Sequence, residues 1–418
     1  MSLAVQDARL DGVRVGLRVD GDQIAAVGPE VAPEPDDDVL DGAGMALLPG
    51  LVNGHTHAAM TLMRGYGDDL PLMKWLQDRI WPTEAKLTAD DVYWGTRLAC
   101  VEMVRTGTVR FWDMYWQPEA IARAVRESGV RAAVALPLVD GLDPDKSDAL
   151  RADAERSLDT LAGAGARVTP TLGPHAIYTV SEKSLHWIAE LSAERGVPVH
   201  IHLSETEGEV HDCVAAHGVR PAQYLDRVGL LTPQTLLAHG VWLDDDELAL
   251  VGERGASVVT NPVSNLKLAV GGVFPYAKAR DHGIPVALGT DGAASNNALD
   301  LFQDVKHLAL IQKHATRDPA AMPATEAWAV ATGQRAPLLG QSGRVAAGEP
   351  ADFLLVRLDV PELTPGDLTA NLVYAASGAV VDTTVVAGRV LMRGGEIANE
   401  VEAREGAVAS ARRLGVIA

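Results

Sequence analysis

Short apolar runs rich in β-branched residues alternate with helix-like segments from residue 46 onward, and this alternation limits the possible folds more than any other feature. Strands that alternate with helices in this way are typical of a (β/α)8 barrel of the TIM type. An open doubly wound sheet would instead place a glycine-rich phosphate loop after the first strand, and the sequence has none there. The eight candidate strands are ALLPGLVNGH (46–55), TVRFWDM (108–114), RAAVALPLV (131–139), ARVTPTLGP (166–174), VPVHIHLSE (197–205), TLLAHG (235–240), ASVVTNP (256–262) and IPVALGTDG (284–292).

The segments between these runs carry helix signals. Residues 90–107 space their apolar side chains three and four positions apart. Residues 181–196 begin with a serine suited to cap a helix and stop at a glycine, and residues 244–255 repeat this pattern. We therefore expect a helix in each of the three segments.

The two ends of the chain differ from its middle. Residues 1–48 and 342–398 consist of short strand-like runs joined by hairpin-type turns such as VDGD and RGGE. We expect both pieces to meet in one small β-sandwich domain, with the barrel occupying residues 49–341. Residues 399–418 have the composition of a helix on the surface.

Composition excludes several classes of protein. The 418 residues carry a formal net charge of −20, so there is no basic excess to neutralise nucleic acid or an anionic membrane. Only two cysteines occur, Cys100 and Cys213, which favours a reducing compartment over a disulfide framework. No apolar run of about 18 residues and no N-terminal targeting pattern is found. We expect a cytoplasmic protein that binds a small molecule and that can form a homo-oligomer.

The first candidate strand ends in His55 and His57, separated by one residue. Because alternate side chains of a strand point to the same face, both imidazoles can reach one metal ion. A strand end with two solvated histidines would have the same spacing, so partners from elsewhere in the chain decide between the two. Such partners follow the other candidate strands: His175, His202, Glu205, His239 and Asp291.

Catalytic groups of a (β/α)8 barrel lie at the carboxyl ends of its strands, where all these residues are predicted. His239 alone could be a buried structural histidine, but the set together predicts a metal site. Imidazoles with one carboxylate suit Zn²⁺, and Fe²⁺ is possible. Glu205 lies three residues after His202 and is the candidate general acid/base. His200 shares a face with His202 one pleat lower, and we interpret it as structural.

Five stretches together resemble the amidohydrolase superfamily: PGLVNGHTH, HLSETEGEV, LLAHGVWL, NPVSNLKLA and LGTDGAASNN. They are most similar to its branch of 5-methylthioadenosine/S-adenosylhomocysteine deaminases and chlorohydrolase-like enzymes. The resemblance covers nearly the whole chain and implies the barrel with a split β-sandwich. Relatives with two metals use a carboxylated lysine on strand 4, and the fourth candidate strand has no lysine, which indicates one metal ion.

The resemblance implies a metal-dependent hydrolytic deaminase acting through a metal-bound hydroxide. It implies that His239 orients the hydroxide or approaches the metal, and that Glu205 moves the proton of the water to a ring nitrogen. Asp291 would help to carry a second proton to the departing ammonia. The implied metal ligands are His55, His57, His202 and Asp291.

The resemblance also implies substrate contacts. Trp75 would pack on a purine, His175 would bind the purine ring, and Glu84 would accept hydrogen bonds from ribose hydroxyls. Arg151 matches an arginine that holds the amino-acid carboxylate of S-adenosylhomocysteine, but its loop is acidic and the second arginine position is apolar. This favours a nucleoside with a shorter 5′ substituent. The loop could instead merely cap the barrel, with Glu84 in a surface ion pair.

The expected reaction is release of the 6-amino group of 5′-methylthioadenosine, S-adenosylhomocysteine or adenosine as ammonia. The alternatives are deamination of another amino-purine, aminodeoxyfutalosine or an amino-pyrimidine, and a triazine-type chlorohydrolase. A proton shuttle at Glu205 suits departure of an amine better than departure of chloride. A barrel that binds a ligand without turnover would normally have lost part of the metal set.

Overall fold

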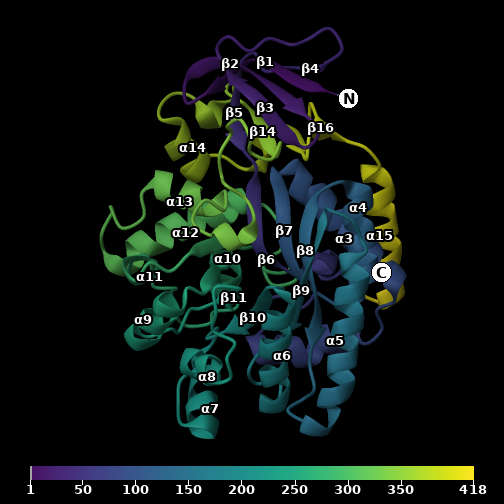
Figure 1. Ribbon diagram of the computed structural model, residues 1–418, viewed down its shortest axis with the longest axis vertical. Helices are drawn as coiled ribbons and strands as arrows, with labels where there is room; N and C mark the ends of the chain where they lie inside the picture. The colour runs from purple at the N-terminus through teal and green to yellow at the C-terminus, as the bar shows by residue number, and fades with distance from the viewer. Residues whose placement is uncertain (1) are drawn as a thin grey trace.

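Eight parallel strands form a nearly closed barrel in the computed structural model, which describes residues 2–418 (Figure 1). They follow one another around the barrel in chain order, from β6 to β13, and each hydrogen-bonds to the next. This confirms the predicted barrel. The strands are β6 (Leu51–Thr56), β7 (Thr108–Met114), β8 (Arg131–Leu138), β9 (Val168–Pro174), β10 (Val199–Leu203), β11 (Thr235–His239), β12 (Ser257–Thr260) and β13 (Val286–Leu288).

Polar contacts join the first and last barrel strands where the ladder ends. The backbone N–H of Asp291 donates to the carbonyl of His55 at 3.0 Å. The Asn53 amide donates to Thr290 Oγ1 at 2.7 Å and its oxygen accepts from the Thr290 N–H at 3.0 Å. A Cβ at Gly289 would lie 2.9 Å from the backbone nitrogen of His55, so this close approach requires glycine. The seam fixes His55 and Asp291 relative to each other.

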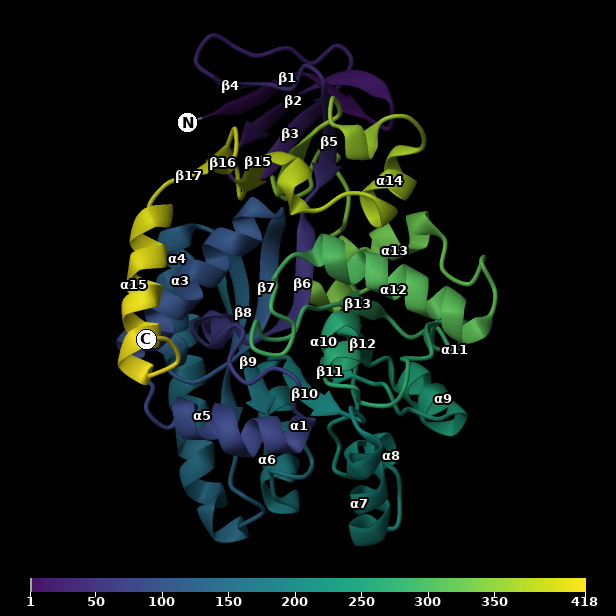
Figure 2. The ribbon, with the colours of Figure 1, turned by 180° about the vertical axis from the view of Figure 1, so that it is seen from behind.

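Helices surround the barrel (Figures 1 and 2). The three segments with helix signals form α3, α6 and α9, and the predicted serine cap is present, since Ser181 Oγ accepts from the Ser184 N–H. The longer helices are α3 (Ala89–Arg105), α4 (Pro118–Ser128), α5 (Ser147–Ala162), α6 (Glu182–Arg195), α7 (Glu207–His217), α8 (Pro221–Arg227), α9 (Asp245–Arg254), α10 (Pro262–Lys267), α11 (Tyr276–Asp281), α12 (Leu301–Thr316), α13 (Ala324–Ala331), α14 (Leu368–Tyr374) and α15 (Glu400–Leu414).

Short helical segments occupy several loops. After β6, residues 64–88 form a covering segment over the carboxyl end of the barrel, which includes three consecutive short helices, α1, η2 and α2. The short segments are η1 (Ala58–Met63), α1 (Leu72–Trp75), η2 (Leu76–Ile80), α2 (Trp81–Glu84), η3 (Pro144–Lys146), η4 (Pro337–Leu339), η5 (Pro361–Leu363) and η6 (Gly378–Val380).

A separate nine-stranded sheet takes strands from both ends of the chain and lies at the top of Figure 1. Its order is β17-β16-β15-β14-β5-β1-β2-β3, with β4 beside β1. The turns VDGD and RGGE lie between β2 and β3 and between β16 and β17, as predicted for hairpins. The strands are β1 (Leu3–Leu10), β2 (Val13–Asp20), β3 (Gln23–Gly28), β4 (Asp38–Asp41), β5 (Met45–Pro49), β14 (Phe353–Arg357), β15 (Val381–Val386), β16 (Arg389–Arg393) and β17 (Glu396–Ile397).

The first candidate strand divides between the two sheets at Gly50. Residues up to Pro49 pair with β14 in the separate sheet, and β6 of the barrel begins at Leu51. A Cβ at Gly50 would lie 2.3 Å from Val109 Cγ1, so the chain can pass from one sheet to the other only without a side chain here. Within residues 2–418, no helix is long and apolar enough to cross a membrane.

Candidate active site

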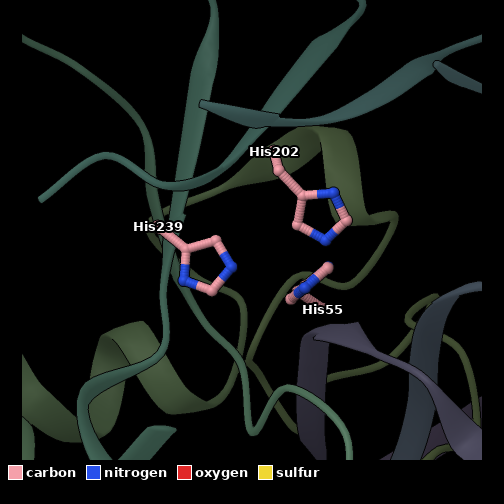
Figure 3. A group of neighbouring side chains, drawn as sticks. All are labelled: His55, His202 and His239. Carbon is pink, nitrogen blue, oxygen red and sulfur yellow. The ribbon is translucent and has the colours of Figure 1, made fainter. Parts of the chain in front are cut away.

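Four histidines and an aspartate converge at the carboxyl ends of the barrel strands. His55 lies on β6 with His57 immediately after it, His202 lies on β10 and His239 is the last residue of β11. Asp291 follows β13. Figure 3 shows the imidazoles of His55, His202 and His239 grouped together, coming from three different strands. All but His57 are at most 6% exposed.

Two overlapping groups of side chains can each hold a metal ion. The ligand atoms of His55, His202 and His239 lie within 4.8 Å of one another, and so do those of His55, His57 and Asp291. Asp291 Oδ1 lies 3.3 Å from Nε2 of both His55 and His57. His55 belongs to both groups, so the four residues predicted as ligands and His239 form one cluster.

Hydrogen bonds on the far side of the rings orient two of the predicted ligands. His57 Nδ1 lies 2.8 Å from the Met114 carbonyl and His202 Nδ1 lies 2.7 Å from the His175 carbonyl. A carbonyl can only accept, so each Nδ1 carries a proton and Nε2 is left as the nitrogen that can bind a metal ion.

Two hydroxyl groups orient the Asp291 carboxylate. Its Oδ2 accepts from Ser264 Oγ at 2.7 Å and from Ser295 Oγ at 2.8 Å. This leaves Oδ1, the oxygen nearest His55 and His57, free to bind a cation. The two serines therefore hold the carboxylate in place through Oδ2, and Oδ1 is the oxygen available to a metal ion.

The electrostatics of the cluster favour a positive charge beside Asp291. Burial alone would raise the pKa of Asp291, but its contacts with the two imidazoles hold the pKa well below its ordinary value. Burial opposes the charged form of His57 too, yet Asp291 outweighs it and raises the pKa of His57 to about 9. Burial lowers the pKa of His55 to about 4, which keeps that imidazole neutral and able to act as a ligand.

The residues fit a divalent metal ion. Among residues 2–418, Nε2 of His55 is buried and has no hydrogen-bond partner, although Asp291 Oδ1 lies 3.3 Å away. A buried imidazole nitrogen that points at a carboxylate and at other imidazoles is typical of a metal ligand. Imidazole nitrogens with one carboxylate oxygen form a donor set for borderline-soft divalent cations.

Three residues of the site have left-handed backbone conformations, which residues other than glycine rarely adopt. Ser204, His239 and Asp291 have φ angles of 50°, 77° and 61°. Each follows or ends a barrel strand, where the left-handed turn directs the chain into the site. Such strain costs of the order of 1–3 kcal/mol per residue and is concentrated at functional sites.

Glu205 is held against the cluster by a second glutamate. Both oxygens of the buried Glu209 accept backbone N–H groups, those of Ser204 and Glu205, at 2.9 Å each. Glu205 Oε1 lies 3.9 Å from His239 Nδ1. Burial raises the pKa of Glu205 and the charge of Asp291 adds to this, while His239 opposes it. A carboxyl with a raised pKa can accept and return a proton near neutral pH.

A cavity of about 630 Å³ opens above the cluster. Glu205, His239 and Asp291 line its floor, and the covering segment supplies Trp75 and Glu84. Burial raises the pKa of Glu84, although Tyr115 and Trp116 oppose the shift. The residues predicted from the sequence that line the cavity are His57, Trp75, Glu84, His175, His202, Glu205, His239 and Asp291, whereas His55 lies beneath them.

Arg151 does not line this cavity. It lies on α5, and its Nε donates to Glu155 Oε1 at 3.0 Å, one helical turn away. The guanidinium is about two-fifths exposed and already paired on the helix surface. The structure therefore gives no support to the predicted contact of Arg151 with a substrate tail.

Sequence reasoning did not identify several residues of the site. Ser264 and Ser295 orient Asp291, Glu209 holds the backbone at Glu205, and Tyr115 lines the cavity beside Glu84. Both serines lie inside stretches that carry the superfamily resemblance, NPVSNLKLA and LGTDGAASNN, so a signal was present. Nothing in the sequence indicated Tyr115.

Comparison with known proteins gives the same family from sequence and from structure. The model of the family described as "Amidohydrolase family" matches residues 46–391. A 5′-deoxyadenosine deaminase of Methanoregula boonei is 51% identical over 379 residues, which cover 90% of this chain and 86% of the relative. 5-Methylthioadenosine/S-adenosylhomocysteine deaminase 1 of Archaeoglobus fulgidus is 44% identical over 392 residues, 93% of this chain and 92% of the relative.

A solved structure extends the likeness to the whole fold. The crystal structure of an adenosine deaminase from Xanthomonas campestris with bound zinc superposes with a TM-score of 0.92 and 32% sequence identity. The match covers 100% of this chain and 98% of that one.

Proposed function

The chain belongs to the amidohydrolase family, and from this premise we propose that it is a metal-dependent hydrolase that deaminates the adenine ring of a nucleoside. The observation that carries the proposal is one cavity with Glu205, His239 and Asp291 on its floor and the Glu84 carboxylate in its wall. Deaminases of adenine nucleosides that are 44–51% identical over about nine-tenths of the chain support the same reaction.

The reaction adds water to C6 of the adenine ring and breaks the bond between C6 and the exocyclic nitrogen. The products are the 6-oxo nucleoside and ammonia. No oxidant, reductant or second substrate is needed, since one water supplies the new oxygen, the proton that stays on the ring nitrogen and the proton that leaves with the amine.

Three residues move or hold protons in this scheme. Glu205 takes a proton from the attacking water and delivers it to a ring nitrogen, which makes C6 a better electrophile. His239 forms a hydrogen bond to the water oxygen and fixes its direction of attack. Asp291 passes the second proton to the exocyclic amine, so that it departs as ammonia.

His55, His57, His202 and Asp291 would hold the metal ion, and we propose Zn²⁺ because imidazole and carboxylate donors suit it. A bound divalent ion supplies a water whose pKa is lowered towards neutrality. The adenosine deaminase with the same fold has zinc bound, which supports this choice over Fe²⁺. Metal analysis of protein purified without added metal would distinguish the two.

The cavity walls suit a nucleoside with an uncharged 5′ group. Trp75 provides an aromatic surface for the purine and His175 a polar edge for it, while Glu84 can accept hydrogen bonds from two vicinal ribose hydroxyls. None of the residues that line the cavity is lysine or arginine, and those contributed by the covering segment are largely apolar. A 5′-deoxy or 5′-methylthio group therefore fits better than a tail that ends in a carboxylate or phosphate.

Ammonia release from a panel of nucleosides tests this proposal. We expect turnover of 5′-deoxyadenosine, 5′-methylthioadenosine and adenosine. S-adenosylhomocysteine and adenosine 5′-monophosphate should have kcat/KM values lower by at least about tenfold. Burying their charged groups without a partner is unfavourable, and a cost of about 1.4 kcal/mol is enough for a tenfold ratio. Zinc-loaded protein that releases no ammonia from any of the five would contradict the proposed reaction.

Glu84→Gln should raise KM for adenosine by about tenfold to a hundredfold with little change in kcat. The reason is that hydrogen bonds to a charged group contribute about 1.5–3 kcal/mol, and the ribose bonds are present in both the bound substrate and the transition state. Steady-state kinetics on adenosine gives both constants. Glu119→Gln, an exposed glutamate on α4, is the matched control. An unchanged KM in Glu84→Gln would remove the ribose contact from the proposal.

A further inference from the structure

One predicted metal ligand is oriented by another imidazole. His55 Nδ1 lies 2.8 Å from His200 Nε2, and both residues are fully buried. The two rings are nearly perpendicular, at 89°, with centroids 4.8 Å apart. His200 lies on β10 two residues before His202, so β10 supplies both a predicted ligand and the residue that contacts a ligand on β6.

This contact differs from those of the other two predicted histidine ligands. Nδ1 of His57 and Nδ1 of His202 each donate a hydrogen bond to a backbone carbonyl. A carbonyl oxygen can only accept, so the direction of these two bonds is fixed. An imidazole nitrogen either accepts or donates, depending on which tautomer the ring adopts. The orientation of His55 therefore depends on a side chain, which a substitution can replace. The orientations of His57 and His202 depend on backbone carbonyls, which a substitution leaves in place.

The geometry determines the direction of the hydrogen bond. Nε2 of His55 points to Asp291 and the other imidazoles, so it must keep its lone pair in order to bind a cation. Nδ1 of His55 then carries the proton and donates it to His200 Nε2. This in turn places the proton of His200 on its Nδ1, which is buried and has no hydrogen-bond partner within residues 2–418.

A buried N–H without a hydrogen-bond partner is unfavourable, so this tautomer of His200 is the unfavourable one for that ring taken alone. The contact with His55 is the interaction that compensates for it.

We propose that His200 is a positioning residue that holds His55 in the tautomer able to bind the metal ion. It is not itself a ligand, because its Nε2 faces His55 and it belongs to neither group of converging ligand atoms. The inference rests on the metal site of the proposed function but not on the identity of the substrate. Partners that orient metal-binding histidines typically change metal affinity by 10–100-fold.

Zinc affinity tests the proposal without reference to turnover. In chelator competition, His200→Leu should bind zinc about 10–100-fold more weakly than the unsubstituted protein. His200→Gln, whose side-chain oxygen can accept from His55 Nδ1, should recover most of that loss. Trp112→Phe is the matched control, since Trp112 packs 5.9 Å from the His200 ring and its substitution leaves the hydrogen bond intact.

A second measurement uses the unsubstituted protein, so it does not depend on a variant that folds. Nitrogen-15 spectra of histidine-labelled, zinc-loaded protein should show protons on Nδ1 of both His55 and His200. His200→Leu with unchanged zinc affinity, or a proton on Nε2 of His200, would overturn the proposal. Failure of the nucleoside panel would leave both results unchanged, so the two proposals can fail independently.

Discussion

Glu205→Gln should lower kcat for adenosine by about a hundredfold to ten-thousandfold, the usual range for loss of a general acid/base. The amide has nearly the same shape as the carboxyl, but it can neither take a proton from water nor deliver one to the ring. Glu209 contacts the backbone at residue 205 and not its side chain, so the loop should keep its conformation. Single-turnover ammonia release measures the chemical step directly.

Two comparisons test the role of Glu205. Glu207→Gln lies two residues further along, in the exposed first turn of α7, and should keep full activity. With a 6-chloropurine nucleoside the Glu205→Gln variant should lose about as much activity as with adenosine, because both reactions need the proton transfer from water to the ring nitrogen. A much smaller loss with the chloro substrate, at unchanged zinc content, would contradict proton transfer to the ring nitrogen and would assign Glu205 to the leaving group instead.

The strand ends could be predicted from sequence because a (β/α)8 barrel collects them at one face. Once eight strands were assigned, His55, His202, His239 and Asp291 had to lie at the same mouth, although up to 236 positions separate them in the chain. The structure places all four together. Their proximity follows from topology, and topology follows from the alternation of strands and helices.

The orientation of these side chains could not be predicted in the same way. Ser204, His239 and Asp291 adopt left-handed backbone conformations, and sequence rules expect these at glycine or asparagine. The bond from His55 to His200 crosses between strands 145 positions apart, and no local pattern indicates it. Such contacts depend on side-chain rotamers, which only the packed structure determines.

Arg151 shows how a positional match to a relative and a local signal in the sequence can disagree. The match to a relative's arginine came from its place after the third barrel strand, but helix geometry determines where the side chain points. Glu155 lies four residues further on, a spacing that pairs opposite charges on a helix surface, and the ion pair is present. This local signal was visible in the sequence and should have taken precedence over the positional match.

Asp291→Asn should have the largest effect of any single substitution, lowering kcat/KM by about ten-thousandfold or more, which corresponds to at least about 5 kcal/mol of transition-state stabilisation. The substitution removes two contributions together. The neutral amide no longer attracts the cation that the cluster is built to hold, and it cannot pass a proton to the departing amine. Shape is preserved, because the hydroxyls of Ser264 and Ser295 can rotate to accept from the amide.

Zinc titration separates these two contributions in Asp291→Asn. If the substitution only weakened binding, saturating zinc would restore activity, so ammonia release should be measured at full metal occupancy. We expect a large residual defect there, since the proton-transfer role does not depend on occupancy. Ser295→Ala, which removes one orienting bond and leaves the charge, should weaken zinc binding while retaining most activity at saturation. If ammonia release by Asp291→Asn at saturating zinc came within about tenfold of the unsubstituted protein, Asp291 would act only as a metal ligand. The second proton transfer would then be assigned to Glu205.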